Sequence, residues 1–255
     1  MSFCEHCVTA VKHTGTPEGR IETIGGTETY VALPSNEFPK DKAVIILTDI
    51  FGHRFVNNQL LSDAFAANGF QTYTPDILNG DPITDELRAS GSFDLADWRT
   101  RHGPADTRPP IDNLLAGLRE RGVTSFALSG YCFGARFVFD LAFEPATTTG
   151  AGVKALAVAH PSQLKVPADL EKLLEIGKAP LLVNSCETDP QYPAEAQKMG
   201  DELLGDGKYK PGYSRTYWPG CTHGFAVRGD VSKPEVKAGK EGAFKATVEW
   251  FINHL

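Results

Sequence analysis

The chain reads Leu128-Ser129-Gly130-Tyr131-Cys132-Phe133-Gly134-Ala135-Arg136 between an apolar run at 123–129 and a segment of helical character at 134–143. This is the pattern small-x-nucleophile-x-small, with cysteine as the nucleophile. A strand that turns abruptly into a helix strains the residue at the turn, and small residues two positions away let strand and helix approach. We therefore expect the Cys132 thiol at the end of a buried strand, facing a helix N-terminus whose dipole favours the thiolate.

The same pattern also has a purely structural interpretation. Free cysteine is among the most buried residue types, and an inert thiol on a tight strand–helix turn satisfies the spacing equally well. A catalytic role for Cys132 requires a base and an orienting acid elsewhere in the chain.

The composition excludes several classes of protein. The chain has 255 residues, 41% of them hydrophobic and 22% charged, which is typical of a soluble globular protein. A net charge of −7, with no Lys/Arg run, argues against nucleic acid or an anionic membrane as the main partner. The apolar runs have strand length, so no transmembrane span is expected. Five scattered cysteines and an N-terminus without signal-peptide features predict a cytoplasmic location.

Four potential metal ligands lie near the N-terminus: Cys4, His6, Cys7 and His13. A Cys-x2-Cys pair with nearby histidine is compatible with zinc, but the second half of a four-ligand set does not follow at the expected spacing. We therefore predict no metal site, and an N-terminal loop with spare thiols.

Apolar periodicity predicts an alternation of strands and helices. The expected strands are a hairpin at 20–24 and 27–33, followed by 43–48, 70–74, 123–129, 153–159, 179–185 and 213–218. The expected helices are 56–68, 111–121, 134–143, 170–176, 194–204 and 234–255. Such alternation predicts an α/β fold, with a mostly parallel sheet and helices on both faces, in one domain over 1–255. Residues 77–108 show little periodicity and are interpreted as a lid or binding loop.

Polar side chains follow four of the expected strands. They are Asp49, His160, Asp189 and His223. Functional groups of open α/β sheets collect beyond the carboxyl ends of the strands. Cys132, Asp189 and His223 follow one another in the order nucleophile, acid, histidine that is typical of α/β-hydrolases. We therefore predict that these three side chains form a catalytic triad.

A family resemblance rests on these residues and on further segments. Gly130 to Gly134, Asp189 and the segment Thr222-His223-Gly224-Phe225 resemble the dienelactone hydrolase (carboxymethylenebutenolidase) family, particularly its eukaryotic and fungal members. Segments 48–52 and 74–78 match as well, and the resemblance extends from about residue 20 to the end. It implies an α/β-hydrolase fold, a Cys–His–Asp triad and the opening of a lactone or ester.

The resemblance also suggests supporting residues. Bacterial members carry Glu where this chain has Asp49, a residue thought to pair with the resting thiol. Their substrate-carboxylate Arg lies one position closer to the histidine than Arg228 does. We expect Asp49 to support the thiol, and Arg228 and Arg101 to be candidates for binding a substrate carboxylate. A surface or structural role is the alternative for each arginine.

The expected reaction is attack of Cys132 on an ester or lactone carbonyl. Backbone N–H groups of Phe133 and Ile50 would form the oxyanion hole. Phe51, Tyr131 and His160 are candidates for lining the pocket, with packing as the alternative. The expected partner is a small ester or lactone; no cofactor is expected, and the oligomeric state is left open between monomer and homodimer. Two other functions remain open: a general carboxylesterase or thioesterase, and a non-catalytic protein with a reactive sensor thiol.

Overall fold

The computed structural model describes residues 9, 11, 13–91, 93–145 and 151–255. Its strands are β1 (Arg20–Ile24), β2 (Thr27–Ala32), β3 (Lys42–Leu47), β4 (Thr72–Pro75), β5 (Ser125–Tyr131), β6 (Val153–Ala159), β7 (Leu181–Thr188) and β8 (Tyr213–Thr222). Its helices are α1 (Val56–Ala67), α2 (Asp85–Ala89), α3 (Leu95–Thr100), α4 (Pro104–Glu120), α5 (Gly134–Ala142), α6 (Ala168–Ile176), α7 (Ala194–Leu204), α8 (Phe225–Arg228) and α9 (Pro234–His254).

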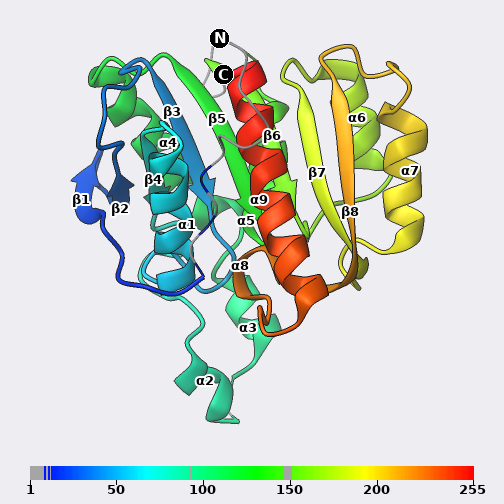
Figure 1. Ribbon diagram of the computed structural model, residues 1–255, viewed down its shortest axis with the longest axis horizontal. Helices are drawn as coiled ribbons and strands as arrows, with labels where there is room; N and C mark the ends of the chain where they lie inside the picture. Colours follow the sequence, from blue (N-terminus) through cyan, green and yellow to red (C-terminus); the bar gives the residue numbers. More distant parts are fainter. Residues whose placement is uncertain (1–8, 10, 12, 92, 146–150) are drawn as a thin grey trace.

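The eight strands form one sheet in the order β1-β2-β4-β3-β5-β6-β7-β8. The β1–β2 and β2–β4 pairs are antiparallel, and every pair from β4–β3 to β7–β8 is parallel. The expected α/β fold with a mostly parallel sheet is therefore confirmed. Helices α1 and α9 cross the near face of the sheet in Figure 1, and both α3 and α8 are seen toward the lower edge of the sheet.

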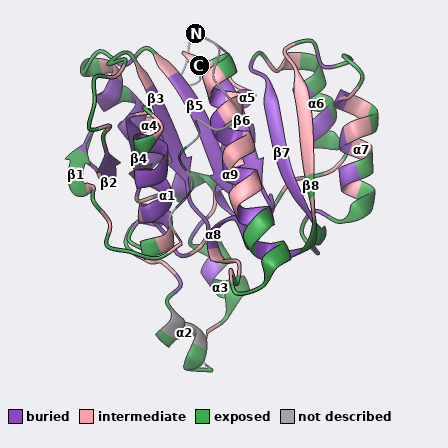
Figure 2. Ribbon diagram, viewed as in Figure 1, coloured by how far each residue is buried: buried purple, intermediate pink, exposed green. Residues whose placement is uncertain are grey.

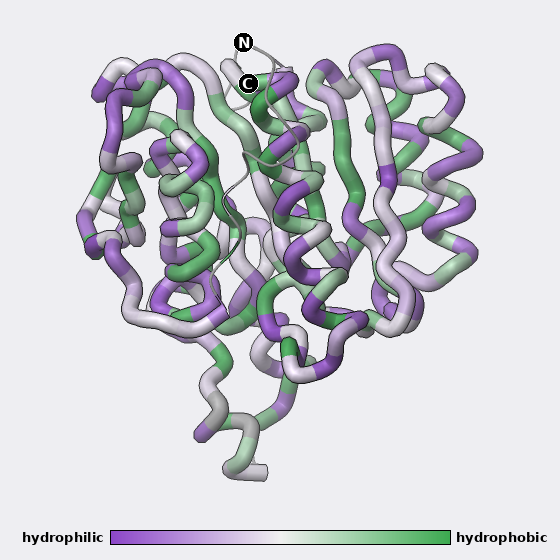
Figure 3. Tube along the Cα trace, in the orientation of Figure 1, coloured by the Kyte–Doolittle hydropathy of each residue, from purple (hydrophilic) through white to green (hydrophobic). Residues whose placement is uncertain are grey.

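Apolar side chains pack on both faces of the sheet. Alternate residues of β3 show this: Ile45 and Leu47 belong to the core shared with α4, α5 and α6, whereas Val44 and Ile46 belong to the core shared with α1 and α9. The continuous apolar sequence of β3 follows from burial on both faces. The central strands are buried and hydrophobic, while exposed hydrophilic residues lie on the outer sides of the helices (Figures 2 and 3). Within the described residues, no helix is both long and apolar enough to cross a lipid bilayer.

Helix α4 begins earlier than the sequence predicts. It was expected to start after Pro109 and Pro110, yet it begins at Pro104 and contains both prolines. Proline lacks an N–H and leaves a carbonyl of the preceding turn without its helical donor. The structure supplies a substitute, because the Asn79 side-chain amide donates to the Asp106 carbonyl, 3.0 Å away. That carbonyl is the one to which Pro110 cannot donate.

Candidate active site

The turn between β5 and α5 places Cys132 beyond the carboxyl edge of the sheet. Its φ is +49°, in the left-handed region that non-glycine residues rarely adopt. A Cβ on Gly134 would lie 2.0 Å from the Leu47 carbonyl oxygen, and one on Gly130 would lie 2.6 Å from a Val138 methyl carbon. Both glycines are therefore required by the close approach of strand and helix, as the small-x-nucleophile-x-small pattern predicts.

The side chains of Cys132, His223 and Asp189 lie in hydrogen-bonding sequence. Cys132 Sγ is 3.0 Å from His223 Nε2, and His223 Nδ1 is 2.8 Å from Asp189 Oδ1. The His223 backbone N–H also donates to the carbonyl of Thr188, the last residue of β7. The ends of β7 and β8 thereby bring the acid and the base to the thiol at the end of β5.

Two opposing effects set the protonation of His223. Burial lowers the pKa of its imidazole, but the hydrogen bonds to Asp189 and Cys132 and their negative charge outweigh burial and raise the pKa to about 9. The imidazolium is thus the favoured form at neutral pH. A cationic ring at 3.0 Å from Sγ stabilises a thiolate.

Asp189 is held by its own loop. Its Oδ1 accepts hydrogen bonds from the backbone N–H groups of Gln191 at 2.8 Å and Tyr192 at 3.2 Å, and the residue is 5% exposed. An Asp before a proline often initiates a turn in this way. Here the same carboxylate both stabilises the turn and contacts His223, so a role in the turn does not prevent contact with the histidine.

A cavity of about 160 Å³ lies over the thiol. Its lining includes Cys132, His223 and both predicted oxyanion-hole residues, Ile50 and Phe133. In the part of the chain that the structure describes, the backbone N–H groups of Ile50 and Phe133 donate to no protein acceptor. Unpaired backbone donors are uncommon in folded proteins, and two of them beside a nucleophile suit a developing oxyanion.

Asp49 does not meet the expectation of thiol pairing. Its carboxylate, fully buried, accepts from Arg228 Nε at 3.0 Å and from Asn58 Nδ2 and the Phe51 N–H, each at 3.2 Å. Burial raises the pKa of this carboxyl above its usual value, while Arg228 opposes the rise. The thiol instead lies near His223 and Ser162, whose Oγ is 3.8 Å from Sγ. The short Asp49 side chain thus forms an ion pair with Arg228 instead of contacting the thiol.

The two arginines predicted to bind substrate differ in position. Arg228 lines the cavity, whereas Arg101 lies at the surface, paired with Asp97 and, at 3.5 Å, with Asp81. Arg99, which the sequence analysis did not select, lines the cavity instead. Arg99 lies on α3 and Arg101 is the residue that caps its C-terminus, two positions further along, and neighbours at that spacing point to different sides of a helix.

The three aromatic candidates lie around the cavity rather than in its lining. Phe51 is buried beneath the guanidinium of Arg228, 4.7 Å from ring centroid to Cζ. Tyr131 is buried and its hydroxyl accepts from Ser129 Oγ at 3.1 Å. His160 is fully buried, with its ring centroid 5.1 Å from that of His223. Packing is therefore the role that the structure shows for all three.

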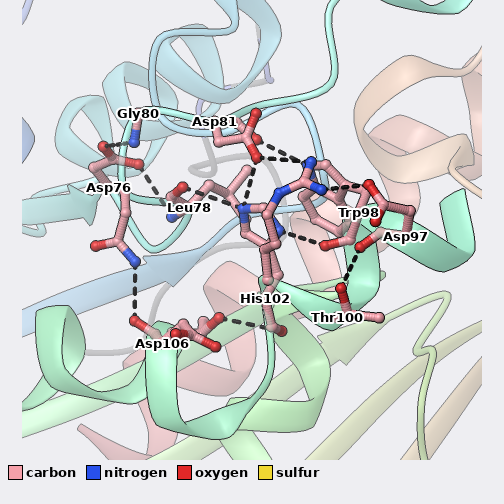
Figure 4. A network of polar contacts seen from close by, with 12 residues as sticks. Asp76, Leu78, Gly80, Asp81, Asp97, Trp98, Thr100, His102 and Asp106 are labelled. Carbon is pink, nitrogen blue, oxygen red and sulfur yellow. Dashed lines mark hydrogen bonds and ion pairs between the residues drawn. The ribbon is translucent and has the colours of Figure 1, made fainter. Parts of the chain in front are cut away.

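The segment 77–108 contributes to the cavity, in keeping with its interpretation as a binding loop. Helix α3 lies within it and places Leu95, Trp98 and Arg99 in the lining. The Trp98 ring stacks on His102, with centroids 3.8 Å apart, and its Nε1 donates to the Asp81 carbonyl (Figure 4). This network joins α3 to the loop after β4.

Other lining residues also escaped the sequence analysis: Ser162, Gln163 and Gln191. Ser162 follows the predicted strand end at His160 by two positions, and Gln191 follows Asp189 by two. Their proximity to a predicted strand end is the sequence feature that could have identified both residues as part of the cavity lining.

No group of three or more metal-ligating side chains occurs among the described residues. The Cys4, His6 and Cys7 cluster lies outside the described residues, so the prediction of no metal there stays a prediction.

A mostly parallel sheet with a cysteine on its strand–helix elbow, followed in the chain by an acid and a histidine, defines the α/β-hydrolase class. Comparison with known proteins specifies the family. The chain belongs to the dienelactone hydrolase family, whose sequence profile matches residues 27–255. It is accordingly a carboxylic ester hydrolase that acts on small molecules.

Individual relatives support this assignment over nearly the whole chain. "Hydrolase tropI" of Talaromyces stipitatus is 31% identical over 258 residues, covering 98% of this chain and 95% of the relative. "Dienlactone hydrolase 1" of Gibberella moniliformis is 30% identical over 250 residues, covering 96% and 91%. Among solved structures, TT1662 of Thermus thermophilus superimposes with a TM-score of 0.63 at 17% identity, covering 92% and 98%. The similarity to TT1662 shows a shared fold and nothing about function.

Proposed function

We propose that this hydrolase opens activated lactones or esters through a thioester on Cys132, with His223 as acid and base and Asp189 as its orienting group. The observation that carries the proposal is the unbroken series of contacts from Asp189 Oδ1 through His223 to Cys132 Sγ, at 2.8 and 3.0 Å, beneath the cavity. Nucleophile, base and orienting acid each have the partner that covalent catalysis requires.

The proposed reaction proceeds in two steps. The Cys132 thiolate attacks the carbonyl carbon, and the N–H groups of Ile50 and Phe133 stabilise the oxyanion. Collapse of this tetrahedral intermediate breaks the ester C–O bond, and the His223 imidazolium protonates the leaving oxygen. His223, now neutral, takes a proton from water as that water attacks the thioester, and the acid product leaves as the thiolate is restored. Only side chains, backbone and water take part.

We further propose that the substrate carries a carboxylate. Arg99 and Arg228 both line the cavity. Arg228 is already paired with Asp49, and in the described part of the chain no acidic side chain lies within 4.0 Å of the Arg99 guanidinium. Arg99 is therefore the cation available to a substrate anion.

Hydrolysis of p-nitrophenyl acetate tests the nucleophile. The Cys132→Ala and His223→Ala variants should lose activity by about 10³-fold or more. Cys221→Ala is the matched control, because Cys221 is a buried cysteine whose thiol donates to the Glu235 carbonyl and does not line the cavity. Activity retained in Cys132→Ala would refute the proposed mechanism.

A pair of substrates tests the carboxylate. A carboxymethylene-substituted butenolide and its carboxamide differ in charge and hardly in shape. Arg99→Gln should raise KM for the carboxylate about tenfold and leave the carboxamide unaffected. Arg101→Gln should change neither, since Arg101 lies outside the lining. Equal effects of Arg99→Gln on both substrates would exclude a carboxylate contact.

A further inference from the structure

His160 is a buried histidine that the proposed reaction does not use. It is fully buried, and neither of its ring nitrogens has a hydrogen-bond partner among the described residues. Buried polar side-chain atoms nearly always have a partner, so an imidazole with two unpaired nitrogens calls for an explanation. The ring itself, rather than its nitrogens, makes the contacts that the structure shows.

The backbone places His160 beside the nucleophile. Tyr131 of β5 pairs with Ala159 of β6, so Cys132 and His160 are the first residues beyond two neighbouring, aligned strands. Both have left-handed backbones, with φ of +49° and +39°. The Cys132 N–H donates to the Ala159 carbonyl at 3.2 Å, and the Ser162 N–H donates to the Cys132 carbonyl at 3.1 Å. The His160 segment is thus fixed against the elbow.

The contacts of the His160 ring are with other rings. It meets His223 edge-to-face, with centroids 5.1 Å apart and planes at 69°. It meets Phe225 similarly, at 5.6 Å and 72°, and Tyr131 at 6.1 Å. The cavity over the thiol is lined by His223 and not by His160. His160 therefore contacts the proposed base without contacting the space for substrate.

The two adjacent imidazoles differ in charge. Burial, together with the positive charges of His223 and Arg228, holds the pKa of His160 well below its usual value. The pKa of His223 is raised to about 9. At neutral pH a neutral ring therefore packs against a cationic one, and edge-to-face packing involves no repulsion between like charges.

We propose that His160 is a positioning residue, whose ring holds the His223 imidazole in line between Asp189 Oδ1 and Cys132 Sγ. The contact that carries the proposal is the ring packing, because the His160 nitrogens bond to nothing in the described chain. The inference rests on the proposed Cys–His–Asp function. Without the His160 ring, His223 gains room to turn away from the thiol.

The test compares His160→Ala with His160→Phe, which restores an aromatic ring. In His160→Ala, kcat for p-nitrophenyl acetate should fall about 10- to 100-fold with KM nearly unchanged, since small misplacements of a catalytic group have effects of this size. The rate of Cys132 alkylation by iodoacetamide at neutral pH should fall in parallel. The pH profile of alkylation should also shift, because the pKa of His223, which its hydrogen bonds to Asp189 and Cys132 raise, falls when those bonds are lost. His160→Phe should recover most of both rates.

Two controls separate the outcomes. Leu156→Ala opens a cavity at a buried position of the same strand, and should lower the melting temperature without moving the pH profile. Cys132→Ala reports on the proposed function itself: if it stays active, that function fails. If Cys132→Ala is inactive while His160→Ala keeps its kcat and pH profile, the positioning role alone is overturned. Equal impairment of His160→Phe and His160→Ala would overturn it as well.

Discussion

The carboxylate of Asp189 separates the effect of charge from the effect of geometry. Asp189→Asn keeps an oxygen that can accept from Gln191 and Tyr192, but removes the negative charge beside His223. We expect the pKa of His223 to fall from about 9, and kcat to fall on the order of 10²- to 10⁴-fold with the fold intact. NMR titration of the imidazole and ester hydrolysis measure the two effects. An unchanged pKa would contradict the assigned role of Asp189.

His223 also links stability to pH. Its folded-state pKa of about 9 lies above the ordinary value of 6.5, so its contribution to stability is fully present below pH 6.5 and is lost as the pH rises through about 9. The difference in unfolding free energy between the native chain and His223→Gln should therefore shrink over this interval. Urea denaturation of both chains at several pH values measures this difference in unfolding free energy. A difference that grows with pH would contradict a raised pKa of His223 in the folded state.

Arg228 and Asp49 form a buried pair whose partners depend on each other. Arg228→Met leaves the fully buried Asp49 carboxylate without its guanidinium, which should cost about 3–5 kcal/mol of stability. Adding Asp49→Asn should restore part of that loss, because the unpaired charge is gone. Urea denaturation of the native chain, both single variants and the double variant gives the four unfolding free energies of a double-mutant cycle. Additive losses would show that the pair is uncoupled.

Single residues differ in how far the sequence predicts them. Cys132, Asp189 and His223 follow strands in a recognisable order, so local pattern was enough to bring them together. Asp49 and Arg228 meet only through long-range packing, and the phase of α3, which decides between Arg99 and Arg101, depends on a helix without apolar periodicity. The position of His160 against His223 likewise depends on how β6, β7 and β8 align, which a single sequence does not reveal.

At the level of elements, the β5–α5 turn depends on the absence of a side chain at Gly134. Gly134→Ala would place Cβ 2.0 Å from the Leu47 carbonyl oxygen, so we expect a loss of about 3 kcal/mol or more. Gly103→Ala is the control, since its Cβ would have no neighbour closer than 3.8 Å and should cost under about 1 kcal/mol. Thermal unfolding compares the two variants. Similar stabilities would contradict the close approach of β3 and α5.

Elements with strong periodicity were predicted nearly to the residue, and those shaped by tertiary contacts were not. Strand β6 and helix α7 have the predicted bounds, because apolar spacing and flanking turn residues define them. The early start of α4 depends on Asn79, a distant donor that no local rule supplies. Helix α8 has four residues, which is too short for periodicity to detect.

At the scale of the whole molecule, the continuous sheet predicts how the chain unfolds. Strands from β1 to β8 share one hydrogen-bonded sheet, and α9 packs against β6, β7 and β8. We propose that the chain is a single domain, and expect urea denaturation followed by tryptophan fluorescence and by circular dichroism to give coincident transitions. Trp98 lies on α3 in the cavity lining, Trp218 lies in β8 and Trp250 lies in α9, so the fluorescence reports on three separate elements. Two separate transitions would contradict the proposal of a single domain.

The central claim is that Cys132 carries the acyl group during turnover. Intact-protein mass spectrometry after brief exposure to p-nitrophenyl acetate, with nitrophenolate release followed in parallel, tests it most directly. We predict a transient increase in mass equal to one acetyl group, located on Cys132, with release that continues after the adduct reaches its steady level. The Cys132→Ala chain should show neither. A stable adduct without turnover, or turnover by Cys132→Ala, would contradict the account.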